Sequence, residues 1–168
     1  MSFVFETVER FVAGTVGEPG ERAFYVQARA GSRLVTVALE KLQVAALAER
    51  LEIVINDLRK GDFSLRIEAL ARDDAPLESP IDSEFDVGAI SMAWDEPREL
   101  MNIELFEVTV DEEEPANCLS VFLTLSMCQA YVRRSKALVN AGRLPCPFCG
   151  IPIDSRGHLC PRANGYRR

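Results

Sequence analysis

The chain has one histidine among its 168 residues, His158, and this scarcity limits the chemistry available to it. Nucleophilic serines and cysteines are activated by a histidine that a third group holds in place. His158 lies in a cysteine cluster, so no further imidazole is left for a Ser-His-Asp or Cys-His pair. We therefore expect a protein that acts by binding, with a zinc-dependent enzyme as a less favoured alternative.

Long hydrophobic runs are also lacking. No stretch approaches the roughly 20 apolar residues of a membrane-spanning helix. The start, Met1 to Glu6, has no basic residue and reaches an acidic one at once, unlike a secretory signal. The five cysteines are an odd number and three are clustered, which favours reduced thiols over a disulfide framework. We expect a cytoplasmic protein with no membrane partner.

The charges are distributed unevenly along the chain. Residues 1–115 contain 11 Lys and Arg against 25 Asp and Glu, whereas residues 116–168 contain 8 against 1. A basic ending of this kind either contacts an anionic partner such as nucleic acid or docks on the acidic body. We favour docking, because the acidic body competes with an external anion for the basic residues.

The hydrophobic pattern predicts three strands followed by a helix, twice over. The strands are expected at residues 8–15, 22–30, 33–39, 85–94, 99–110 and 118–125. The first helix, about residues 40–60, has one apolar face and is expected to end at Gly61. The second is expected to begin with a capping box of Ser126 and Gln129 and to end near residue 140. Antiparallel meanders covered by helices predict an α+β fold, with two β-meander–helix units packed as one domain.

Several residues outside the cysteine cluster are expected to be structural. Gly14, Gly17 and Gly20 resemble a phosphate-binding loop, but they lead into a strand, so hairpin turns explain them better. Residues 73–84 are expected to form an acidic loop with two prolines. Residues 111–115 are expected to be a hairpin tip, whose acidic cluster is better explained as a solvated tip than as a cation site. The expected core includes apolar cysteines and aromatic residues: Cys118, Cys128, Trp94, Phe3, Phe5, Phe11, Phe24 and Tyr25.

The ending contains a pattern typical of a metal site. Its spacing is Cys146-x₂-Cys149-x₈-His158-x-Cys160. Thiolates and an imidazole in this arrangement suit a tetrahedral Zn²⁺. We therefore expect an α+β body at residues 1–142 and a tail at 143–168 that binds a structural zinc ion.

The fourth ligand is less certain from spacing than the three cysteines. In an extended strand, His158 and Cys160 would point to opposite faces, so both bind only if the backbone bends between them. Asp154 or water could otherwise complete the shell, and an open position is the mark of catalytic zinc. A thioredoxin-type redox pair and plain reduced thiols are weaker alternatives. A zinc deaminase is disfavoured, because His158 is not followed by the glutamate which that chemistry needs.

Three segments together resemble a known family. They are Arg10-Phe-Val-Ala-Gly-Thr-Val-Gly-Glu-Pro-Gly-Glu-Arg22, the run Val37 to Arg50, and the ending Cys146-Pro-Phe-Cys-Gly-Ile-Pro-Ile-Asp…Gly-His-Leu-Cys-Pro-Arg-Ala-Asn-Gly165. The chain resembles the actinobacterial family called domain of unknown function 3090 over almost its whole length. The resemblance implies genomic neighbours similar to a phosphoglycerate mutase and to a kinase. It also implies that the Cys/His ending is a family feature, and it supplies no activity or catalytic residues.

Together these patterns predict a cytoplasmic zinc-binding protein that acts as a non-catalytic protein-interaction or adaptor module. The expected partner is a protein. The alternative is a nucleic-acid-binding protein that uses its basic, zinc-stabilised ending, where Arg156, Arg162, Arg167 and Arg168 lie.

Overall fold

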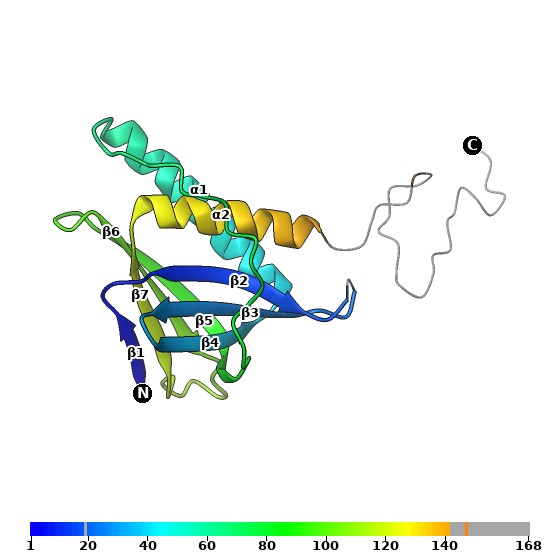
Figure 1. Ribbon diagram of the computed structural model, residues 1–168. Helices are drawn as coiled ribbons and strands as arrows, with labels where there is room; N and C mark the ends of the chain where they lie inside the picture. The colour runs from blue at the N-terminus through cyan, green and yellow to red at the C-terminus, as the bar shows by residue number, and fades with distance from the viewer. Residues whose placement is uncertain (19, 142–146, 148–168) are drawn as a thin grey trace, which may run out of the picture.

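A computed structural model describes residues 1–18, 20–141 and 147 of the chain (Figure 1). It contains seven strands and two helices in the described residues. In chain order these are β1 (Ser2–Phe5), β2 (Arg10–Val16), β3 (Ala23–Ala30), β4 (Arg33–Leu39), α1 (Lys41–Gly61), β5 (Ser83–Asp95), β6 (Leu100–Glu107), β7 (Cys118–Leu123) and α2 (Leu125–Asn140). The predicted order of three strands and a helix, repeated once, is therefore confirmed, with one additional strand at the start.

All seven strands form one sheet in the order β1-β7-β6-β5-β4-β3-β2. Strands β2 to β4 form one antiparallel meander and β5 to β7 form the other. The two meanders join through a parallel pairing of β4 with β5, which connects Thr36 with Ser83 and Ala38 with Asp86. The mixed α/β architecture is thus confirmed, and the two meanders share one sheet.

The short strand β1 was not predicted from the sequence. It pairs in parallel with β7 at one edge of the sheet, and β2 forms the other edge. Only residues 6–9 separate the two edge strands, and they can span about 17 Å when extended. Seven flat strands would place the edges about 29 Å apart, so the sheet must curve. Arg33 at the start of β4 donates to the Val4 carbonyl at 2.6 Å, which agrees with this curvature.

The core forms between the sheet and the two helices. Helix α1 buries the predicted apolar face, with Val44, Leu47 and Leu51 almost inaccessible to solvent. Helix α2 lies against α1 and β2, and the Tyr131 ring is 5.3 Å from the Phe11 ring. Among the aromatic residues expected in the core, Phe5, Phe11 and Phe24 are buried, whereas Phe3, Tyr25 and Trp94 are only partly buried.

The predicted helix ends need correction. Gly61 is the last residue of α1, and the cap is the extended residue Asp62, whose N–H donates to the Leu58 carbonyl.

The N-cap of α2 is Thr124, whose hydroxyl accepts from the Met127 N–H at 3.2 Å. The prediction of a Ser126–Gln129 capping box was therefore wrong, because Thr124 satisfies the free N–H two residues earlier. The chain does contain a capping box, formed by Glu40 and Gln43 at the start of α1.

The segment between α1 and β5, residues 62–82, is called the strap below. Figure 1 shows it crossing α2 and then β2 before it enters β5. Phe11 faces α2, whereas Gly14 lies directly under the Leu77 side chain. Successive side chains of a strand point to opposite faces, so the strap passes around the β2 edge to the face opposite α2. There Gln27 exchanges two hydrogen bonds with the Glu78 backbone, at 2.8 and 2.9 Å.

Candidate functional site

The four predicted zinc ligands, Cys146, Cys149, His158 and Cys160, lie outside the described residues. The alternative ligand Asp154 also lies outside them. Within residues 1–18, 20–141 and 147, no group of three or more His, Cys, Asp or Glu side chains is arranged to hold a metal ion. The zinc site therefore remains a prediction, and the described body offers no competing site of that kind.

The two cysteines of the body differ in their surroundings. Both are free thiols. Cys128 on α2 is fully buried, and burial raises the pKa of its thiol to about 12. It therefore stays protonated and unreactive at neutral pH. Cys118 at the start of β7 is only partly buried, so the expectation of a core position holds for Cys128 alone.

Helix α2 is held firmly near its end, where the cysteine-rich ending begins in the sequence. Arg22 donates to the Leu138 carbonyl at 3.1 Å, and Lys136 forms an ion pair with Glu52 of α1. The helix closes with the Ala141 N–H bonded to Ala137. Cys146 follows Ala141 by five residues, so the predicted ligands start close in sequence to a well-anchored helix end.

Asp73 of the strap lies between two arginines, one from the edge strand and one from α2. Arg10 donates from Nε to Asp73 Oδ2 at 2.7 Å and from Nη2 to Oδ1 at 3.2 Å. Arg134 approaches Oδ1 at 3.5 Å through its Nη1. The hydrogen bond from Arg10 is the main cause that lowers the pKa of Asp73. The carboxylate is therefore ionised at neutral pH and ties β2 to the strap.

The strap is also held through its backbone by arginines of α2. Arg134 donates to Ala13 of β2 at 2.8 Å and to the Asp73 and Ala75 carbonyls at 2.9 and 2.7 Å. Arg133 donates to the Leu70 carbonyl at 3.2 Å. Burial and the nearby charge of Arg10 lower the pKa of Arg134, although the guanidinium stays charged. These bonds connect three elements that are distant in sequence.

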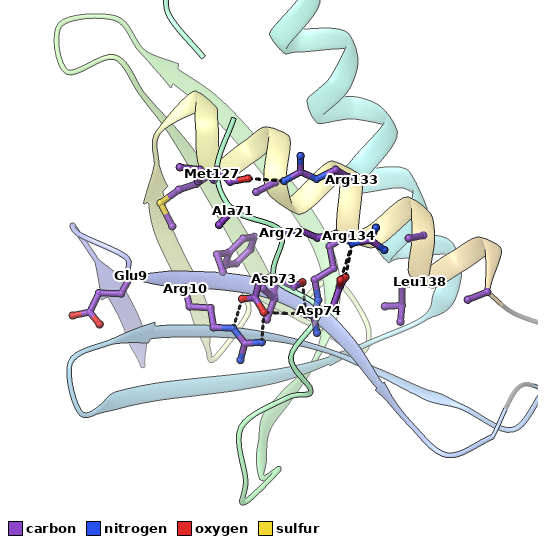
Figure 2. Close-up of a pocket in the computed structure, with 16 residues that line it drawn as sticks. Glu9, Arg10, Ala71, Arg72, Asp73, Asp74, Met127, Arg133, Arg134 and Leu138 are labelled. Atoms are coloured by element: carbon purple, nitrogen blue, oxygen red, sulfur yellow. Dashed lines mark hydrogen bonds and ion pairs between the residues drawn. The ribbon is translucent and has the colours of Figure 1, made fainter. Parts of the chain in front are cut away.

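Between these elements lies a cavity of about 540 Å³, called the groove below. It is lined by Glu9 and residues 10–12 of β2, by residues 70–74 of the strap, and by the face of α2 from Met127 to Leu138 with its cap residue Ala141. Figure 2 shows Asp73 of the strap between Arg10 of β2 and Arg134 of α2, with Arg133 also on α2. Much of the lining is apolar, including Leu70, Met127 and Leu138.

The groove was not predicted from the sequence. The predicted acidic loop at 73–84 is a loop up to residue 82, but its sequence does not show that Asp73 is half-buried and Leu77 is buried. The one sequence feature that points to the groove is the adjacent pair Arg133-Arg134, which lies in the second predicted helix. A pair of arginines does not reveal that one of them reaches across to the edge strand.

The family model described as protein of unknown function (DUF3090) matches residues 3–160. The match covers the body and all four predicted zinc ligands, so the chain belongs to this family. Comparison with curated proteins and with solved structures gives no significant match.

Proposed function

We propose that this protein is a cytoplasmic zinc-binding protein that acts as a non-catalytic protein-interaction or adaptor module. The observation that carries the proposal is the spacing Cys146-x₂-Cys149-x₈-His158-x-Cys160. A short segment rich in Pro and Gly buries too little surface to fold alone, and a structural zinc ion supplies the missing free energy. Cys146, Cys149, His158 and Cys160 would hold the metal.

The free thiols of the described body support the cytoplasmic assignment, and the fixed end of α2 supports a binding role. Cys118 and Cys128 are free thiols, as expected in a reducing compartment such as the cytoplasm. No helix among the described residues is long and apolar enough to cross a membrane. The α2 end, fixed by Arg22 and Lys136, would serve as a rigid base for the zinc-bound segment.

The basic ending supports nucleic-acid binding as a second candidate function. Residues 142–168 contain five arginines and one aspartate, whereas residues 1–141 contain 14 Lys and Arg against 25 Asp and Glu. The acidic body repels phosphate at distances up to about 8 Å, the Debye length at physiological salt. This repulsion is the reason for preferring a protein partner.

Binding to generic RNA and DNA, measured by fluorescence anisotropy over a range of salt concentrations, separates the two candidates. The adaptor proposal predicts no detectable binding near physiological salt. Submicromolar binding that weakens steeply with salt, and that is lost when Arg162, Arg167 and Arg168 are changed to Ala, would replace it with the nucleic-acid function. Lys60→Ala combined with Arg59→Ala, at the end of α1, controls for removal of exposed positive charge elsewhere.

A further inference from the structure

We propose that the groove between β2, the strap and α2 binds a small organic anion with an apolar body. The residues that carry this proposal do not include the predicted zinc ligands. Its volume of about 540 Å³ lies within the range of about 300–1,000 Å³ typical of small-molecule sites.

The groove has a small surplus of positive charge, which favours an anionic ligand. Its lining carries four arginines, Arg10, Arg72, Arg133 and Arg134, and three carboxylates, Glu9, Asp73 and Asp74. The surplus is local, because residues 1–141 as a whole contain 11 more acidic than basic residues. A cation-rich recess on an acidic body concentrates anions where the rest of the surface repels them.

Arg133 is the residue that supplies the uncompensated charge. Arg10 is paired with Asp73 at 2.7 Å and Arg72 with Asp74 at 2.7 Å, and Arg134 shares Asp73. Among the described residues, Arg133 has no carboxylate within ion-pair distance, and its bond to the Leu70 carbonyl uses only Nη2. Its remaining N–H groups are free to donate to a carboxylate or phosphate, the anions that a guanidinium binds best.

The apolar part of the groove lining indicates that the rest of the ligand is apolar. Leu70 is 39% exposed, and Ala71 and Ala137 are also exposed within the groove. An apolar ligand group that covers this surface removes it from water, which favours binding. The basic residues 142–168 of the chain itself match this positive groove poorly, so an external anion is the better occupant.

Calorimetry with three probes of one shape tests the proposal on the full chain. The probes are naphthalene-2-carboxylate, its neutral carboxamide and the corresponding naphthylmethylammonium. We expect the carboxylate to bind at least about tenfold more tightly than the carboxamide, because a charge-assisted bond to arginine is about twice as strong as a neutral one. The ammonium probe should not bind. Equal binding of carboxylate and carboxamide, or no heat from the carboxylate at millimolar concentration, would overturn the proposal.

Two variants test whether the anion binds in the groove. Arg133→Gln should weaken carboxylate binding about tenfold, whereas Arg50→Gln, an exposed position of α1, makes the same charge change and should leave it unaltered. Ala137→Phe should fill the groove and abolish binding while the melting temperature stays within a few degrees of the wild type. Carboxylate binding that survives both Arg133→Gln and Ala137→Phe would show that the anion binds elsewhere.

Discussion

At the scale of single residues, Gly14 shows how closely the strap approaches the edge strand. A Cβ atom at this position would lie less than 3.0 Å from both Cγ and Cδ2 of Leu77. Real Cβ atoms do not approach other atoms so closely, and Leu77 is buried, so its side chain cannot swing aside freely. The strap can therefore pack on this face of the sheet only because residue 14 lacks a side chain.

Gly14→Ala is accordingly expected to lower the free energy of unfolding by about 1–3 kcal/mol, the usual effect of overpacking. Denaturant unfolding measures the change. Gly61→Ala is the matched control, since Gly61 ends a helix and, apart from its chain neighbours and the backbone of its own helix, nothing lies within 4 Å of the place that its added methyl group would take. That control should be neutral or stabilising by up to about 1 kcal/mol.

The double variant Gly14→Ala/Leu77→Ala tests the assigned cause. If the clash with Leu77 is responsible, adding Gly14→Ala to a Leu77→Ala background should cost far less than adding it to the wild type. Equal costs in the two backgrounds would show that the methyl group acts through some other contact.

At the scale of elements, the strap is held to β2 and α2 mainly through charges. Arg10 and Arg134 both bind Asp73, and Ser126 accepts from the Glu68 N–H at 2.9 Å. The strap forms no strand or helix between α1 and β5, so these side chains replace the hydrogen bonds of regular structure. This dependence makes the attachment of the strap sensitive to pH.

The sign of the pH effect follows from the lowered pKa of Asp73, whose main cause is the hydrogen bond from Arg10. A carboxylate with a lowered pKa stabilises the fold above its unfolded pKa of about 3.9 and loses that contribution as pH falls through the folded pKa. Asp73→Asn should therefore be less stable than the wild type at pH 7, and the difference should shrink below about pH 4. The Asp73 side chain is 40% exposed, so solvent screening keeps the effect modest.

Thermal unfolding of the wild type, Asp73→Asn and Asp74→Asn between pH 2.5 and 7 checks this expectation. Asp74 is the matched neighbour, because it pairs with Arg72 in an ion pair whose side chains are 67% and 72% exposed. Its substitution should change stability little at any pH. A constant difference between the wild type and Asp73→Asn across this range would contradict the role given to the ionised carboxylate.

At the scale of the whole molecule, local patterns predicted six of the seven strands and both helices. Apolar periodicity is a local signal, and the face of α1 that buries Val44, Leu47 and Leu51 follows it directly. Strand β1 was missed because four residues carry too little pattern, and its pairing with β7 joins positions more than 110 residues apart.

The groove could not be predicted for a related reason. Asp73, Arg10 and Arg134 meet only because the strap wraps around the sheet edge, and nothing in their sequence neighbourhoods indicates that path. The predicted zinc ligands present the opposite case: Cys146, Cys149, His158 and Cys160 lie within fifteen residues, so their spacing alone is enough to predict a site.

The zinc content of the full chain tests the central proposal most directly. Protein purified without chelator and kept reduced should contain about one zinc ion per chain by elemental analysis. Cys149→Ser should contain far less, while its circular-dichroism spectrum stays close to that of the wild type, because the body has its own buried core. Freshly purified, reduced wild-type protein that contains no metal would contradict the account.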